Sequence, residues 1–162
     1  MQMSNNHAPK TEQKILIIGA SWVGDMVMGQ TLLIFLKAQF PKSNIDVIAP
    51  SWSKGILERM PEINKCIDLP FKHKEFKPLM RRKVGKLLRK NNYDRAYILP
   101  NSWKSALIPF FAKIPTRVGF KGESRYGLLT DLKKLDKQAL PLMIDRFLSL
   151  GLSKIKKPTT SD

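Results

Sequence analysis

The chain has 162 residues, of which 43% are apolar, with 29 Lys and Arg, 13 Asp and Glu and a single cysteine, Cys66. The length predicts one domain of ordinary size, and the apolar fraction excludes wholesale disorder. One cysteine forms no internal disulfide and no metal cluster, so a reducing compartment is expected. The formal net charge of +16 favours a polyanionic partner: nucleic acid, an anionic membrane surface or a phosphorylated substrate.

Short apolar runs alternate with segments of helical spacing along the chain, after a polar segment at residues 1–13 that is predicted to be a disordered leader. No run approaches the length of about 18 apolar residues that a membrane span needs. Strands are predicted over residues 14–18, 45–49, 65–69, 95–99 and 117–119, and helices over 25–40, 54–60, 78–90, 103–111 and 140–150. This alternation predicts an α/β, Rossmann-like domain over residues 14–151, with a mostly parallel, doubly wound sheet and helices on both faces. Residues 152–162 read as an interdomain linker.

The turn between the first predicted strand and its helix, residues 19–26, lies where doubly wound folds bind their ligands. It reads Gly-Ala-Ser-Trp-Val-Gly-Asp-Met, with the two glycines five residues apart. This spacing lacks the three closely set glycines of a dinucleotide-binding turn. The second glycine is followed by Asp25 and Met26, where a P-loop has Lys and a hydroxyl residue, so a P-loop nucleotide site is disfavoured.

Asp25 has two compatible interpretations. As a helix-terminal residue it would accept hydrogen bonds from free backbone N–H groups and complement the helix dipole. As a general base at the rim of a ligand cleft it would be held ionised by the same dipole and would take a proton from a substrate hydroxyl. The residues alone leave both interpretations open.

A basic stretch follows the third predicted strand and runs from residue 72 to residue 90. It is either a solvated helix face or an anion-binding loop on the same sheet edge as Asp25. Nucleic acid is ranked below a phosphorylated small or lipid-linked substrate as the partner, because no known binding motif is present and Phe76 is the one aromatic side chain of the stretch. No metal site is expected, because His7 and His73 lack metal-ligand spacing.

Polar loops over residues 101–105 and 119–127 follow the fourth and fifth predicted strands. At the carboxyl edge of a parallel sheet such loops grip sugar or phosphate ligands, but helix capping and turn formation explain them equally well. Trp103, Phe110 and Phe111 are predicted to belong to the core. The Met and Phe residues of the final predicted helix are predicted to pack against the sheet.

Four segments together resemble the ADP-heptose:lipopolysaccharide heptosyltransferases, type II in particular. They are Ser-Trp-Val-Gly-Asp-Met-Val-Met at 21–28, Asn-Ser-Trp-Lys-Ser-Ala-Leu-Ile-Pro-Phe-Phe at 101–111, Arg-Tyr-Gly-Leu-Leu-Thr-Asp at 125–131 and Pro-Leu-Met at 141–143. The likeness covers residues 14 to 150 in unbroken order, with Ala20 where the family often has Pro and Trp103 where Phe is usual. Enzymes of this family have two Rossmann-like domains in the GT-B arrangement, with the active site between them. The chain resembles the N-terminal, acceptor-side domain, and the C-terminal donor-binding domain has no counterpart in it.

The resemblance implies an inverting transfer of heptose from ADP-heptose to the first inner-core heptose of lipopolysaccharide, with Asp25 as the catalytic base. This domain alone is expected to be inactive. The turn residues Ser21, Trp22 and Gly24 would shape the acceptor pocket. The basic residues implied in binding the acidic acceptor are Lys72, Lys74, Lys77, Lys104 and Arg125.

The resemblance also implies partners and a location. The acceptor would be the heptose-bearing inner core on Kdo-lipid A, and ADP-heptose would be held mainly by the C-terminal domain, with no metal or other cofactor. The protein would be cytoplasmic and peripheral to the anionic inner face of the inner membrane. The alternatives are a sibling heptosyltransferase for another core position and a non-catalytic basic domain that binds acidic glycolipid or nucleic acid.

Overall fold

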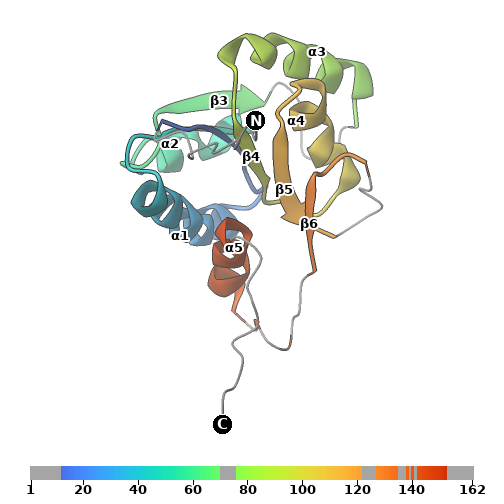
Figure 1. The fold of residues 1–162 in the computed structure, drawn as a ribbon. Coiled ribbons are helices and arrows are strands. Elements are labelled where there is room, and N and C mark those ends of the chain that lie inside the picture. The colour runs from blue at the N-terminus through green and yellow to red at the C-terminus, as the bar shows by residue number, and fades with distance from the viewer. Residues whose placement is uncertain are drawn as a thin grey trace, which may run out of the picture.

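A computed structural model describes residues 12–69, 76–121, 127–134, 138, 140 and 142–152 (Figure 1). The expected leader and linker therefore lie almost wholly outside the described residues. The strands are β1 (Lys14–Ile18), β2 (Asn44–Pro50), β3 (Lys65–Leu69), β4 (Arg95–Ile98), β5 (Thr116–Phe120) and β6 (Asp131–Lys133). The helices are α1 (Val23–Gln39), α2 (Lys54–Leu57), α3 (Pro78–Leu88), α4 (Leu107–Phe111) and α5 (Met143–Gly151), with short 3-10 turns at Ser51–Ser53, Arg89–Asn91 and Trp103–Ala106.

The six strands form one parallel sheet in the order β3-β2-β1-β4-β5-β6, which confirms the predicted Rossmann-like fold. β1 lies inside the sheet and pairs with both β2 and β4. Its residues Ile15, Leu16 and Ile17 are fully buried. A strand covered on both faces needs apolar side chains in both directions, which explains the continuous apolar run of this segment.

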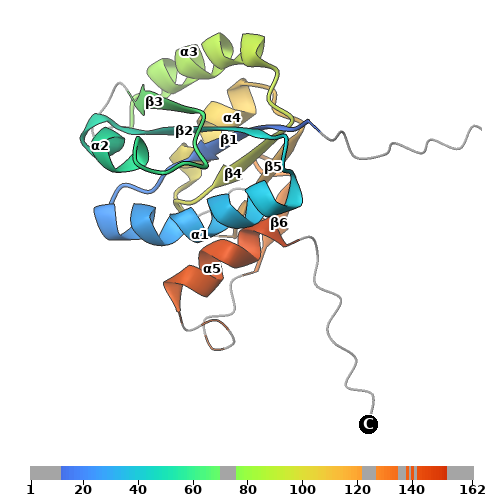
Figure 2. The same cartoon turned by 90° about the vertical axis from the view of Figure 1, so that its left-hand side faces the viewer.

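Helices cover both faces of the sheet, as predicted (Figures 1 and 2). On one face α1 and α5 pack together over Ile15, Ile17 and Val47, in a core that includes Phe147. On the other face α3 and α4 cover a second core that includes Leu16. The molecule is therefore a three-layer α/β domain. Separately, no helix among the described residues is long and apolar enough to cross a membrane.

α3 and α4 approach each other closely at Gly85. A Cβ at this position would lie 2.6 Å from the Phe111 Cβ and 2.9 Å from the Ile108 carbonyl oxygen, both shorter than real contacts allow. The Arg89 Nε also donates a hydrogen bond to the Phe111 carbonyl, at 2.7 Å. A glycine is thus required where α3 rests on α4.

The sequence-based prediction was wrong at some places. It missed β6, whose three half-buried residues Asp-Leu-Lys carry no apolar run and are recruited by pairing with β5. It placed a helix over 54–60, but α2 ends at Leu57 and tightens into turns before Pro61. It assigned Trp103 and Phe110 to the core, but both are exposed.

Candidate functional site

The turn after β1 is tightly folded by backbone contacts at Gly19. The Gly19 N–H donates to the Ile48 carbonyl at 2.9 Å, and the next N–H, of Ala20, donates to the Met26 Sδ at 3.0 Å. A Cβ at position 19 would lie 3.0 Å from both the Ala49 Cβ and the Met26 Sδ. The small residue lets the chain turn at once from β1 into α1, which brings the start of the helix to the carboxyl edge of the sheet.

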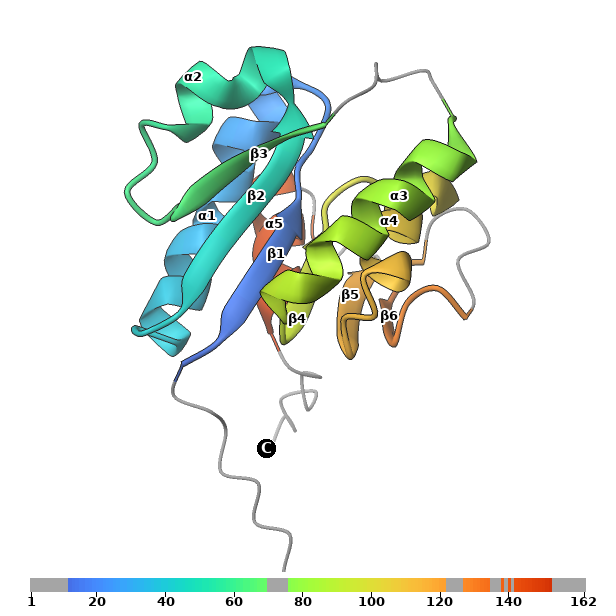
Figure 3. The ribbon, with the colours of Figure 1, turned by 90° about the horizontal axis from the view of Figure 1, so that it is seen from above.

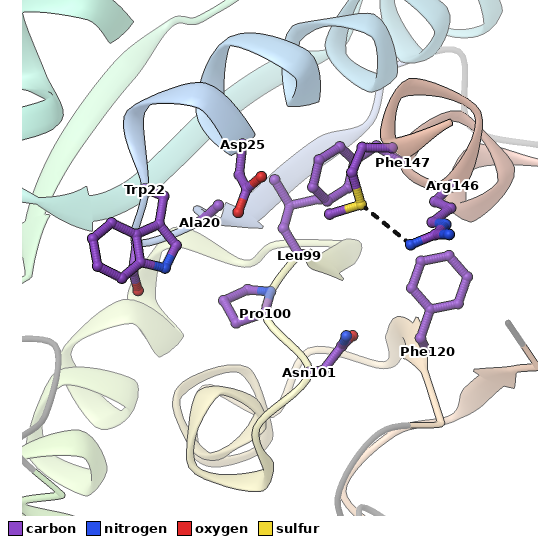
Figure 4. A pocket seen from close by; sticks show the side chains of 11 residues that line it. Ala20, Trp22, Asp25, Leu99, Pro100, Asn101, Phe120, Arg146 and Phe147 are labelled. Atoms are coloured by element: carbon purple, nitrogen blue, oxygen red, sulfur yellow. Dashed lines mark hydrogen bonds between the residues drawn. The ribbon is translucent and has the colours of Figure 1, made fainter. Parts of the chain in front are cut away.

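Asp25 lies in the first turn of α1 and is half-buried. The residue that precedes the helix, Trp22, has extended backbone and makes no side-chain capping bond. Among the described residues none donates a hydrogen bond to the Asp25 carboxylate, and the Met26 N–H donates instead to the Trp22 carbonyl, at 3.0 Å. The structure thus gives Asp25 no capping role toward the described backbone, and its carboxylate faces a pocket (Figure 4).

This first pocket has a volume of about 270 Å³ and is built by four parts of the chain. The turn before α1 and its first turn contribute one wall, the segment after β4 the floor, and the end of β5 with α5 the opposite wall (Figure 4). The lining residues are Ala20, Ser21, Trp22, Asp25, Leu99, Pro100, Asn101, Phe120, Met143, Arg146 and Phe147. A carboxylate among aromatic and apolar walls suits the binding of a sugar ring and the removal of one of its hydroxyl protons.

Arg146 brings a cation to the wall opposite Asp25 (Figure 4). Its Nε donates to the Leu140 carbonyl at 2.8 Å, and its Nη1 lies 3.6 Å from the Met143 Sδ. The sequence pattern predicts only packing for this helix and does not indicate Arg146 as a site residue. The predicted packing of this helix is confirmed for Phe147, which is buried in the core. The position of Arg146 directly before Phe147 is the one signal in the sequence that could have indicated it.

A second, smaller pocket adjoins the first and has a volume of about 60 Å³. Ser21 and Pro100 line both pockets. Arg81 and Lys104 line the second, and Arg81 is only 4% exposed, with its Nε donating to the Phe76 carbonyl at 2.7 Å. Burial lowers the Arg81 pKa to about 10. The second pocket therefore presents two cations beside the carboxylate of the first.

The residues predicted as site residues are only partly brought together. Ser21 and Trp22 line the first pocket with Asp25, whereas Lys104 lines the second. Gly24 is exposed, and Lys77 is exposed before α3 with a left-handed backbone at φ 36°; neither lines these two pockets. The predicted residues Lys72, Lys74 and Arg125 lie outside the described residues. In the sequence, Arg81 is one of many cations of the basic stretch 72–90, and nothing in the pattern distinguishes it as a pocket residue.

Cys66 is half-buried on β3, and burial raises the pKa of its thiol. Within the described ranges no group of three or more His, Cys, Asp or Glu side chains is arranged to hold a metal ion. Among the described residues, the two pockets combine the carboxylate of Asp25 with neighbouring cations and polar side chains.

A Rossmann-like parallel sheet with a carboxylate pocket at its carboxyl edge has the architecture of one half of a GT-B glycosyltransferase, and the structure matches heptosyltransferases of that class. Residues 81–161 match glycosyltransferase family 9 (heptosyltransferase). The chain belongs to this family.

The chain is 53% identical over 149 residues to lipopolysaccharide heptosyltransferase 2 of Escherichia coli K12, covering 92% of this chain and 43% of that protein. It is 55% identical over 141 residues to lipopolysaccharide heptosyltransferase 2 of Salmonella typhimurium, covering 87% of this chain and 40% of that protein. The solved structure of E. coli ADP-heptose lps heptosyltransferase II matches with a TM-score of 0.82 and 52% identity, covering 88% of this chain and 41% of that one. The chain thus spans about two fifths of the length of these relatives.

Proposed function

We propose that this chain forms the acceptor-binding side of an enzyme that transfers heptose from ADP-heptose to the first inner-core heptose of lipopolysaccharide. The observation that carries the proposal is the 53% identity to a lipopolysaccharide heptosyltransferase 2 over almost the whole chain, including the turn that bears Asp25. The pocket at that turn supports it, because a carboxylate faces a cavity with aromatic and apolar walls.

In the proposed reaction Asp25 is the general base. Its carboxylate takes the proton of an acceptor hydroxyl while that oxygen attacks the anomeric carbon of the donor heptose. The new glycosidic bond forms as the bond from the anomeric carbon to the diphosphate oxygen breaks, and ADP leaves with the bonding electrons. Attack opposite the leaving group inverts the anomeric centre. The negative carboxylate also favours the oxocarbenium character of such a transition state.

We assign acceptor binding to the turn residues Ser21, Trp22 and Gly24 and to the basic side chains of the same edge. These are Lys72, Lys74, Lys77, Lys104 and Arg125. Their charge suits the carboxylates and phosphates of a Kdo-lipid A acceptor. We assign most donor contacts to a second, C-terminal domain, joined through residues 152–162, and we expect no nucleic-acid partner. The lipid-anchored acceptor places the protein peripherally at the cytoplasmic, anionic face of the inner membrane.

A fusion tests the proposal. The present chain replaces the matching segment of the E. coli relative, and transfer from ADP-heptose to a heptosylated inner-core acceptor is followed by mass spectrometry. We expect the fusion to add one heptose and the chain alone to bind the acceptor without transfer. A folded fusion that transfers no heptose to this acceptor, but transfers it to an acceptor lacking the first heptose, would favour a sibling enzyme. Salt-sensitive binding of DNA equal to that of the acceptor would favour a non-catalytic basic domain.

A further inference from the structure

The positive charge of the chain is concentrated in one half of the sheet. Residues 12–69 carry six Lys and Arg and six Asp and Glu, whereas residues 76–121 carry twelve Lys and Arg and one acid, Asp94. Asp94 lies just before β4, where its carboxylate accepts a hydrogen bond from the Lys14 backbone N–H at 2.9 Å. The helices of the second half therefore present a cationic surface to solvent.

The outward side of α3 combines cations with exposed apolar side chains. Leu79, Lys83 and Lys86 follow one another at spacings of four and three residues, so they share one side of the helix, and Lys90 follows in the 3-10 turn Arg89–Asn91, where it is exposed. Leu79 is 79% exposed and Leu87, beside them, is 57% exposed. The other side of α3, with Gly85 and Leu88, is buried. Figures 1 and 3 show α3 as the outermost element on its face of the sheet.

A basic groove of about 460 Å³ runs beside α3, between it and the segment that follows α4. It is lined by five cations, Arg82, Lys86, Arg89, Lys113 and Arg117, and no acidic residue is among its lining residues. The Arg117 guanidinium lies over the exposed Phe110 ring, 5.4 Å from its centroid, and burial lowers the Arg117 pKa. The groove thus continues the cationic and apolar character of α3.

We propose that this α3 surface, made of Leu79, Lys83, Lys86, Leu87, Lys90 and the basic groove, docks the protein on a bilayer of anionic phospholipid. Lysines around exposed leucines suit an interface in which acidic headgroups overlie acyl chains. Phosphate groups alone, as in nucleic acid, would leave the leucines in water. Arg81 near the start of α3 lines the second pocket, so docking through α3 keeps the site close to the lipid surface.

This inference deepens the proposed function by assigning the membrane contact to one surface, but its test requires no transfer. The 162-residue chain is sedimented with vesicles of phosphatidylcholine, with and without phosphatidylglycerol. We expect binding only to the anionic vesicles, weakening as salt rises. Replacing three cations, K83Q/K86Q/K90Q, should weaken partitioning on the order of 100-fold, since each cation near an anionic surface contributes about fivefold.

A matched triple variant, K42Q/R59Q/K65Q, removes the same charge from exposed positions of the neutral half. It should change partitioning less than about threefold, because its charges lie away from the docking surface. Equal losses from the two triples would overturn the proposal, since net charge alone would then explain binding. Absence of binding to anionic vesicles, or tighter binding of duplex DNA than of those vesicles, would also overturn it.

The leucines provide a second, independent test. L79S/L87S should weaken vesicle binding by about tenfold at high salt, where charge is screened. Ile34→Ser removes an exposed apolar side chain from α1 and should leave binding unchanged. Unchanged binding of L79S/L87S would overturn the apolar part of the surface. Because the fusion assay can be run with an inner-core acceptor freed of its lipid, a failed transfer there leaves this proposal intact, and failed vesicle binding leaves the transfer proposal intact.

Discussion

The two pockets at the carboxyl edge of the sheet adjoin each other but differ in chemistry. The first places the Asp25 carboxylate among aromatic walls, and the second places the cations Arg81 and Lys104 in a smaller cavity. Ser21 and Pro100 are common to both. Under the proposed function the two pockets would divide the work, with the reacting sugar in the first and an anionic group of the acceptor in the second. Because one turn contributes to both, the two pockets are positioned by the same backbone.

The largest effect is expected from the carboxylate of the first pocket. In the fusion, Asp25→Asn removes the proton acceptor and should lower kcat about 10²- to 10⁴-fold without changing the melting temperature. Asp145→Asn is the matched control, because Asp145 occupies the same first-turn position in α5 and does not line the first pocket. Steady-state kinetics check the expectation. Near wild-type turnover of the Asp25 variant would remove this residue as the base.

The next largest effect is expected from α3, the helix that contributes Arg81 to the second pocket. Gly85→Ala forces α3 away from α4 and should lower the free energy of unfolding by about 2 kcal/mol, as overpacked cores do. Gly55→Ala, at a helical position with open space around it, should be neutral or add about 0.5 kcal/mol. Urea unfolding measures both. A Gly85 variant as stable as the wild type would contradict the close helix contact.

A substitution of Lys104 tests the role of the second pocket separately from that of the first. Lys104→Met should raise the acceptor KM about tenfold, the value of one hydrogen bond to a charged group, and leave kcat nearly unchanged. Lys42→Met, at an exposed position remote from both pockets, is the control. The acceptor KM and kcat are measured with acceptors that carry or lack the acidic sugar Kdo. If the variant loses kcat with both acceptors, the division between the pockets is wrong.

The smallest effect is expected where the pockets meet. Ser21→Ala should raise the acceptor KM by a few-fold, because one neutral hydrogen bond contributes about 1 kcal/mol. The exposed Ser51→Ala, outside both pockets, should have no effect. Titration calorimetry with the acceptor measures the difference. An effect of Ser21→Ala larger than that of Lys104→Met would mean that the turn, and not the cations, dominates binding.

The strands were predictable where apolar residues dominate and are buried on both faces, as in the continuous run of β1 and in β2, where Asp46 is the one charged residue. β6 was not, because Asp131, Leu132 and Lys133 become a strand only through pairing with β5. The functional turn was predictable because strand, glycine turn and helix are adjacent in the chain. Arg146 was not, because it reaches the Asp25 pocket from more than a hundred residues away, through packing of α5 on α1.

The sequence alone decided the class of fold, the turn after β1 and the candidate base within it, since each depends on residues that follow one another. Only the tertiary structure decided which distant side chains share a pocket, that Arg81 is buried while Lys77 faces solvent, and that the charge excess lies on one half of the sheet. The physical reason is that sheet order and helix packing are set by burial of the whole core. Residues far apart in the chain are therefore brought together at one edge by contacts that neither segment encodes separately.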